Sequence, residues 1–164
     1  MREAAGKRPE ALIGEALRKK GLKLCAAESC TGGLLSKMIT DIPGSSDYFL
    51  GGIVAYDNRV KKRLAGVKAS TLKRYGAVSG QTALELAEGV RKRLKSDIGV
   101  SITGIAGPGG ARPGKPVGTV FIGAASDKKT IVKRFLFKGN RASIRRLSAL
   151  EALKVTGALI GVKI

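Results

Sequence analysis

Ala26-Ala27-Glu28-Ser29-Cys30-Thr31-Gly32-Gly33 is the stretch around which the chain is organised. A short apolar run over residues 22–27 leads into it and predicts a buried strand. The amphipathic pattern of residues 31–40 predicts a helix directly after it. The two glycines leave this strand-to-helix turn open to close approach, and the first N–H groups of a helix have no partner inside it. The hydroxyl of Ser29 therefore has three possible roles here: a helix cap, an anion ligand or a nucleophile.

The absence of histidine limits the chemistry that this chain can perform. It excludes Ser-His-Asp and Cys-His catalysis, and zinc sites that need imidazole. Acid–base chemistry must then use Lys, Tyr, Cys or one of the 12 carboxylates. The two cysteines, Cys25 and Cys30, lie five residues apart across one strand and turn, which favours neither a disulfide nor a metal site. We expect both thiols to be reduced, and no metal to be bound.

The size and composition favour a single domain over residues 1–164. Hydrophobic residues make up 43% of the chain, which is enough for a sizeable core. No apolar run approaches the ~20 residues of a membrane span. The charged segment 1–10 lacks the apolar stretch of a signal peptide. We therefore expect a cytoplasmic protein with no membrane association.

The formal net charge of +19 raises nucleic acid as a partner. The basic residues are, however, spread along the chain, mostly on predicted helix faces and turns. Aromatic residues make up only 4%, so no row of stacking platforms for single strands is present. The sequence thus favours a solvated basic surface, and nucleic acid stays a possible but not a favoured partner.

The order of predicted elements indicates the fold class. Helices are expected over residues 9–20, 31–40, 58–64, 70–75, 79–94 and 140–159. Strands are expected over residues 22–27, 47–56, 98–105, 117–125 and 130–137. Asn58, Ser79 and Asn140 are predicted helix caps, and residues 126–129 predict the turn of a hairpin. Because helices and strands alternate early and strands pair late, we predict an α/β fold, a three-layer α/β/α sandwich with a mixed β-sheet.

A second stretch, Tyr56-Asp57-Asn58-Arg59-Val60-Lys61, is expected at the same sheet edge as Ser29. A strand delivers Tyr56 to its C-terminal end, and Lys61 follows one turn into a helix. Lysine acts as a base only where burial or nearby positive charge destabilises its ammonium form. The pattern leaves two alternatives open: Lys61 as an exposed helix lysine, and Tyr56 as a core aromatic residue.

A third stretch, Thr103-Gly104-Ile105-Ala106-Gly107-Pro108-Gly109-Gly110, follows a predicted central strand and also opens at a sheet edge. Its glycines leave amides free for a phosphate or an oxyanion. Within it, Gly109-x4-Gly114-Lys115 looks like the start of a P-loop. Pro116 follows instead of Ser or Thr, and the next residues predict a strand instead of a helix, so we reject a P-loop.

The three stretches, together with Pro43-Gly44-Ser45-Ser46, Gly76-Ala77-Val78-Ser79 and Lys115-Pro116-Val117-Gly118-Thr119, resemble the CinA C-terminal-domain family of competence/damage-inducible proteins. The resemblance covers roughly residues 8–160. It implies an α/β/α sandwich, often dimeric, with no cofactor. It also implies a nicotinamide-nucleotide amidohydrolase of the pyridine nucleotide cycle, which converts nicotinamide mononucleotide and water to nicotinic acid mononucleotide and ammonia. The chain is too short for the further domain of multidomain relatives, so it resembles the stand-alone form.

The resemblance also assigns roles to residues. Ser29 matches the nucleophile, and Tyr56 and Lys61 match its activating partners. The residues implied in binding the nucleotide substrate are Glu28, Cys30, Thr31, Gly32, Gly33, Asn58, Thr103, Gly104, Gly107, Gly109, Gly110 and Arg141, the last as a phosphate contact. This mechanism agrees with the absence of histidine, because Lys61, through Tyr56 or directly, takes the proton of Ser29.

The chain departs from the family pattern at Ala111 and Arg112, where the family usually has Gly and Thr. Arg112 adds charge and bulk beside the expected pocket and bears on which nucleotide fits it. Two other functions stay open at this point: a member of the family that binds nucleotide or nucleic acid without catalysis, and an amidase for a different small amide.

Overall fold

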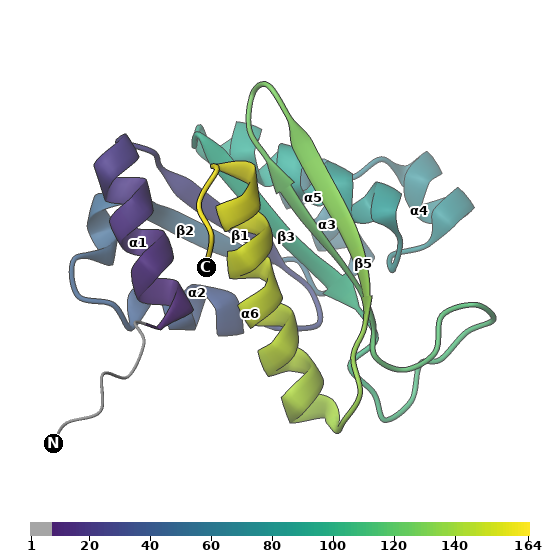
Figure 1. Cartoon of the computed structure of the whole chain (residues 1–164). Helices are drawn as coiled ribbons and strands as arrows, with labels where there is room; N and C mark the ends of the chain where they lie inside the picture. The colour runs from purple at the N-terminus through teal and green to yellow at the C-terminus, as the bar shows by residue number, and fades with distance from the viewer. Residues whose placement is uncertain (1–7) are drawn as a thin grey trace, which may run out of the picture.

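A mixed five-stranded sheet forms the centre of the computed structural model, which describes residues 8–164 (Figure 1). Residues 1–7 of the charged segment 1–10 considered above lie outside the described residues. The first three strands in spatial order are parallel to one another. The fourth is antiparallel to the third, and the fifth is antiparallel to the fourth. In that order the strands are β2 (Phe49–Val54), β1 (Leu24–Glu28), β3 (Ile98–Gly104), β4 (Thr119–Ala125) and β5 (Thr130–Leu136). The predicted mixed sheet and the β4–β5 hairpin are confirmed.

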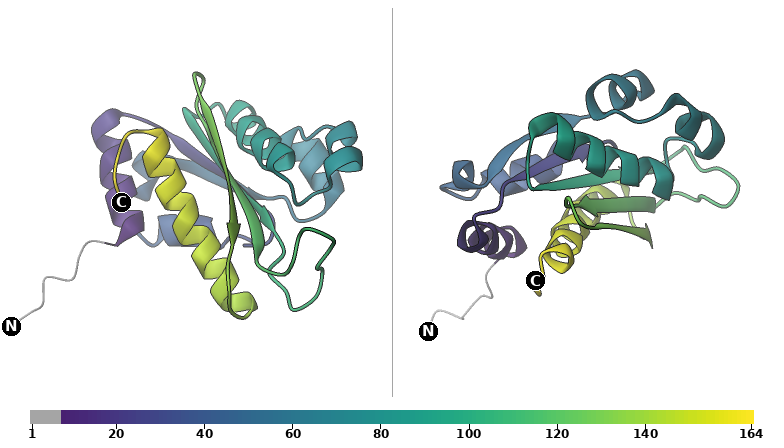
Figure 2. Two further views of the ribbon diagram at one scale, coloured as in Figure 1. Left: turned by 45° about the vertical axis from the view of Figure 1, so that its right-hand side comes forward. Right: turned by 90° about the horizontal axis from the view of Figure 1, so that it is seen from above.

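Helices cover both faces of the sheet, as the view from above in Figure 2 shows. One face carries α1 (Pro9–Lys20), α2 (Leu34–Thr40) and α6 (Arg141–Leu159). The other carries α5 (Gly80–Leu94), against which α3 (Asn58–Ala65) and α4 (Ala69–Tyr75) pack. The three-layer α/β/α sandwich predicted from the sequence is therefore confirmed.

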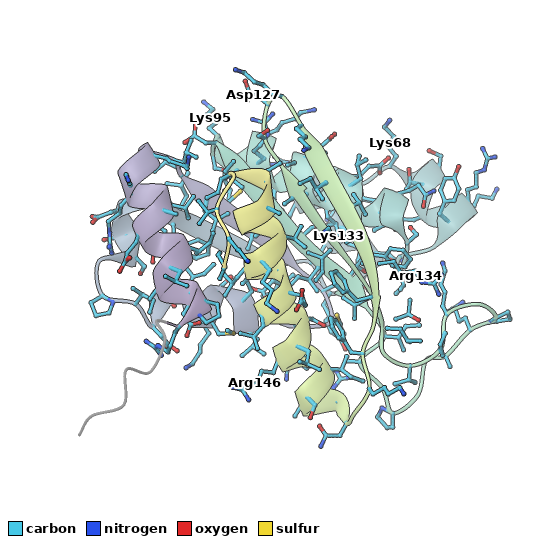
Figure 3. All side chains as sticks on the ribbon, viewed as in Figure 1. Lys68, Lys95, Asp127, Lys133, Arg134 and Arg146 are labelled. Atoms are coloured by element: carbon cyan, nitrogen blue, oxygen red, sulfur yellow. The ribbon has the colours of Figure 1, made fainter. Side chains whose placement is uncertain are left out.

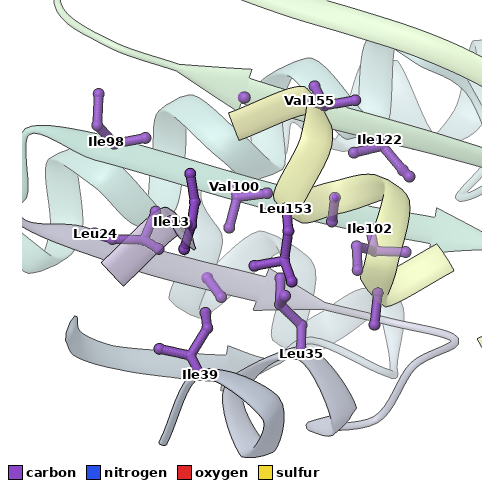
Figure 4. Packing of buried hydrophobic residues seen from close by; sticks show 14 of the residues in the cluster. Ile13, Leu24, Leu35, Ile39, Ile98, Val100, Ile102, Ile122, Leu153 and Val155 are labelled. Carbon is purple, nitrogen blue, oxygen red and sulfur yellow. The ribbon is translucent and has the colours of Figure 1, made fainter. Parts of the chain in front are cut away.

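The alternation of side chains along β1 builds two cores. Leu24 and Ala26 face the layer of α1, α2 and α6, where Ile13, Leu35 and Leu153 bury the larger cluster (Figure 4). Cys25 and Ala27 face the opposite layer and pack in a smaller cluster that includes Leu86 and Val90 of α5. All five residues of β1 are buried, because helices cover both faces of this central strand.

Several local predictions are confirmed and two are wrong. The side chains of Ser79 and Asn140 cap α5 and α6 as expected, and both cysteines are free and buried. Helix α2 begins at Leu34 instead of residue 31, because Gly32 and Gly33 adopt left-handed φ angles of 58° and 97° that a helix does not continue through. Asp57, not Asn58, caps α3 by accepting the N–H of Arg59.

No helix within residues 8–164 combines the length and the apolar character that a membrane span needs.

Candidate active site

The C-terminal ends of the three parallel strands place all three predicted stretches at one edge of the sheet. Ser29 follows β1, Tyr56 follows β2, and residues 105–110 of the third stretch, which we call the glycine-rich loop, follow β3. The chain leaves β1 toward α2 on one face and leaves β2 toward α3 on the other. Neighbouring strands whose connections part in this way open a crevice, which is the usual ligand position in α/β sheets.

The Ser29 turn is held by the residue before it. The carboxylate of Glu28, which is 1% exposed, accepts N–H bonds from Gly33, Leu35 and Ser36 at 3.1, 3.0 and 2.8 Å, and the Ser36 hydroxyl at 2.7 Å. Glu28 therefore satisfies the first N–H groups of α2 and places a negative charge at the positive end of the helix. The start of α2 is thus occupied by Glu28, and neither Ser29 nor a bound anion caps it.

The hydroxyl of Ser29 is not engaged within the described part of the chain. It is 8% exposed, its N–H donates to Ile102 of β3 at 2.9 Å, and its hydroxyl makes no hydrogen bond within residues 8–164. The next two amides, of Cys30 and Thr31, donate to no other residue in the described part of the chain, apart from contact of the Cys30 amide with its own thiol. Two adjacent donors beside an unengaged hydroxyl form the arrangement that stabilises an oxyanion.

Lys61 is buried, so the exposed-lysine alternative is wrong. Its side chain is 1% exposed, and its amine donates to the carbonyl oxygens of Ala55 and Tyr56, both at 2.8 Å. Burial lowers the pKa of Lys61 below its ordinary value of 10.5, against the opposing influence of Asp57 and Cys30. A lysine in this environment is a better proton acceptor near neutral pH than a surface lysine.

Tyr56 lies at the mouth of the site instead of in the core. Its side chain is 60% exposed, and its hydroxyl accepts a hydrogen bond from Arg141 of α6 at 3.3 Å. Arg141 also donates to the carbonyl oxygen of Gly107 at 2.7 Å. Arg141 thus joins the end of β2, the glycine-rich loop and the start of α6 in one bridge.

The thiol of Cys30 stays protonated beside these groups. The residue is 6% exposed, and burial raises the pKa of its thiol to about 11. A thiol in this state is a poor nucleophile, because the thiolate is the reactive form. Ser29 is therefore the stronger candidate for covalent chemistry, despite the neighbouring sulfur.

The remaining predicted residues divide between the scaffold and an adjoining cavity. Thr103 is buried and its hydroxyl donates to the carbonyl of Ala77 at 2.7 Å, while Gly104 ends β3 against the Thr119 carbonyl. A side chain at Gly109 would project into open space. Asn58 and Gly110 line a cavity of about 470 Å³ between α4 and the glycine-rich loop.

Arg145 is a residue of this region that the sequence analysis missed. It donates to the carbonyl oxygen of Thr31 at 2.6 Å, and its buried Nε has no partner among residues 8–164. Arg145 therefore supports the Ser29 turn from α6. Its spacing of four residues from Arg141 places both guanidinium groups on one helix face, and this spacing was the available sequence signal.

Comparison with known proteins gives a consistent result. The family model described as the CinA C-terminal domain matches residues 7–160. One relative, from Caldanaerobacter subterraneus subsp. tengcongensis, is named as a competence-damage inducible protein. It is 53% identical over 143 residues, which make up 87% of this chain and 35% of that protein. A CinA-like protein of Thermotoga neapolitana is 48% identical over 145 residues, which make up 88% of this chain and 35% of that protein. The chain spans about a third of the length of these curated relatives.

Solved structures share the whole fold. The competence/damage inducible protein CihA from Agrobacterium tumefaciens is 36% identical and superposes with a TM-score of 0.89, covering 94% of this chain and 96% of that one. A CinA superfamily protein from Enterobacter cloacae is 32% identical with a TM-score of 0.86, covering 98% and 95%. The similarity therefore includes the strand ends that carry Ser29, Tyr56 and the glycine-rich loop.

Proposed function

The chain belongs to the CinA C-terminal domain family, and from this membership and the geometry at the sheet edge we propose that it is an amidohydrolase acting on nicotinamide mononucleotide. The products are nicotinic acid mononucleotide and ammonia. The observation that carries the proposal is the buried amine of Lys61, held on two carbonyl oxygens in the helix that follows Tyr56. A lysine with a lowered pKa and an unengaged serine at the same sheet edge are the kind of pair that activates a nucleophile without histidine.

The amine of Lys61 has three positions for hydrogen, and the carbonyls of Ala55 and Tyr56 take two of them. In the neutral amine, the third position is a lone pair. We propose that this lone pair accepts the proton of the Ser29 hydroxyl. Ser29 Oγ then attacks the carboxamide carbon while its proton passes to Lys61 Nζ.

The carbonyl oxygen of the substrate becomes an oxyanion in this step. The amides of Cys30 and Thr31, which donate to no other residue in the described part of the chain, are its donors in our proposal. Collapse of the intermediate breaks the C–N bond, and Lys61 returns the proton to the leaving nitrogen, which departs as ammonia. Water then attacks the acyl-serine ester, Lys61 accepts a proton from it, and Ser29 recovers its hydroxyl hydrogen.

The side chain of Tyr56 has a different place in this scheme from the proton relay suggested by the resemblance. Its carbonyl, not its hydroxyl, contacts Lys61, and its hydroxyl contacts Arg141 at the mouth. We therefore assign the Tyr56 side chain to substrate positioning, and the direct transfer from Ser29 to Lys61 to the chemistry.

The test is ammonia release from nicotinamide mononucleotide by the wild type and by Ser29→Ala, with the nucleotide product identified by mass spectrometry. We expect Ser29→Ala to lose at least about a thousandfold in kcat, as removal of a nucleophile typically does. Ser70→Ala, a change at an exposed serine of α4, is the matched control and keeps full activity. An inert wild type contradicts the proposed reaction, and full turnover by Ser29→Ala contradicts the nucleophile.

A further inference from the structure

The cavity beside the site has a floor and rim suited to one end of a nucleotide. Its volume of about 470 Å³ lies within the usual range for small-molecule sites. Leu72, Val78 and Ile105 give it an apolar floor, and Arg112 and Lys115 are its charged residues. No carboxylate is among the described residues that line it, so both of its charged side chains are positive.

Two links join this cavity to the proposed nucleophile and base. Asn58, which lines the cavity, lies three residues before Lys61 in α3, so both share one face of that helix. On the other side, Ser29 bonds to Ile102 of β3, and the next residue of β3, Thr103, bonds to Ala77 of the cavity wall. Through α3 and β3, the cavity wall is therefore connected to the elements that carry Lys61 and hold Ser29.

A short hairpin carries Arg112 and Lys115, and contacts with neighbouring elements hold it in place. Residues 112 and 115 exchange backbone hydrogen bonds of 2.9 and 2.8 Å. The Lys115 amine donates to the carbonyl of Tyr75 at the end of α4, at 3.0 Å, and Arg134 of β5 donates to Gly114 at 2.7 Å. The hairpin is thus tied to elements on both of its sides, and these contacts hold the backbone of Arg112 beside the cavity.

The guanidinium of Arg112 is fully available to a ligand, whereas the guanidinium of Arg141 is partly engaged. Arg112 makes no side-chain hydrogen bond or ion pair within residues 8–164. Arg141, the phosphate contact implied by the family resemblance, already holds Gly107 and Tyr56. Arg141 uses two of its five N–H donors in these bonds, whereas all five donors of Arg112 are available to an anion.

We propose that this cavity receives the phosphate-bearing end of the nucleotide substrate, and that Arg112 is the residue that binds the phosphate and selects phosphorylated substrates. The inference rests on the proposed function, because it gives the nonreacting part of that substrate its place. Guanidinium groups bind phosphate through charge-assisted and often bidentate hydrogen bonds. Arg141 then serves to hold the loop and Tyr56 in position.

The first test compares nicotinamide mononucleotide with nicotinamide riboside, which carries the same amide and no phosphate. Arg112→Ala is expected to raise KM for the mononucleotide about 10- to 100-fold with little change in kcat, and to leave the kinetics of the riboside unchanged. Arg112→Lys, which keeps the charge without the planar fork, should recover part of the loss. Lys128→Ala, at an exposed turn outside this cavity, is the control and leaves KM and kcat unchanged for both substrates.

A binding measurement separates this inference from the proposed function. Calorimetric titration of Ser29→Ala with nicotinamide mononucleotide needs no turnover, and addition of Arg112→Ala should weaken the affinity by the same factor. An inert wild type whose Ser29→Ala form still binds in an Arg112-dependent way removes the reaction and keeps the cavity assignment. Unchanged affinity and KM in Arg112→Ala, or equal losses for both substrates, overturn the inference.

Discussion

The amine of Lys61 titrates in surroundings that favour its neutral form. Burial lowers its pKa from the ordinary value of 10.5, so the base is present at a lower pH than for a surface lysine. If Lys61 accepts the proton of Ser29, kcat/KM rises with pH as the ammonium form disappears. The ascending limb should have a pKa below 10.5 in a pH–rate profile of the wild type.

Replacement of the amine tests this assignment at the same scale. Lys61→Met removes the titrating group, so the variant should lose at least about a thousandfold in kcat/KM and show no ascending limb. Lys62→Met, at the next and exposed position of α3, keeps both the rate and the limb. Circular dichroism checks that the variants are folded. An ascending limb that persists in Lys61→Met identifies another group as the base.

Single residues of the candidate site differ in how far the sequence reveals their positions. The stretches that carry Ser29 and Lys61 are predicted to meet at one edge because parallel strands present their C-terminal ends there. The contact of Glu28 with the start of α2 is not predicted from the sequence, because its carboxylate reaches the α2 amides only after residues 30–33 fold back beside it. The burial of Lys61 also depends on tertiary packing, since the sequence pattern of α3 alone is that of an exposed basic helix.

At the scale of elements, the position of Lys61 depends on how closely α3 packs against α5. A Cβ atom at Gly89 of α5 would overlap the carbonyl oxygen of Ala65, the last residue of α3. Gly89→Ala therefore forces the two helices apart. We expect it to lower the free energy of unfolding by about 1–3 kcal/mol, measured by urea denaturation, and to lower kcat because α3 carries Lys61.

The same substitution elsewhere on α5 gives the control. A Cβ atom at Gly80, the first residue of the helix, makes ordinary contacts of 3.6 Å with Val132 and 3.7 Å with Phe121. Alanine there improves helix propensity, so Gly80→Ala should keep or raise stability by up to about 1 kcal/mol. Equal effects of the two substitutions would mean that the approach of α3 to α5 does not limit stability.

Elements with strong periodicity are predicted well, and their ends are not. The apolar run of β3 and the β4–β5 hairpin are found where expected because their patterns are local. The start of α2 is displaced because the left-handed backbone of Gly32 and Gly33 opposes the apolar pattern that begins at residue 31. The cap of α3 is displaced by one residue because Asp57 and Asn58 are both good caps, and only the backbone decides between them.

At the scale of the whole molecule, the charge of +19 is distributed over many elements. Figure 3 labels exposed basic residues of β5 and α6, and others beside α4 and α5. Long-range electrostatics sum over all such charges, whichever element carries them. A positive field around the molecule therefore attracts any phosphate-bearing substrate, in addition to the local contact proposed for Arg112.

This field gives a measurable dependence on ionic strength. The Debye length falls from about 10 Å at 0.1 M to about 3 Å at 1 M salt, so distant lysines and arginines stop contributing as salt rises. We expect kcat/KM for nicotinamide mononucleotide to fall several-fold over this range, measured at constant pH. Nicotinamide riboside lacks the phosphate and has a positively charged ring, so its kcat/KM should stay constant or rise. Parallel declines for both substrates would mean that salt acts on the protein itself, and the +19 charge would then have no part in substrate capture.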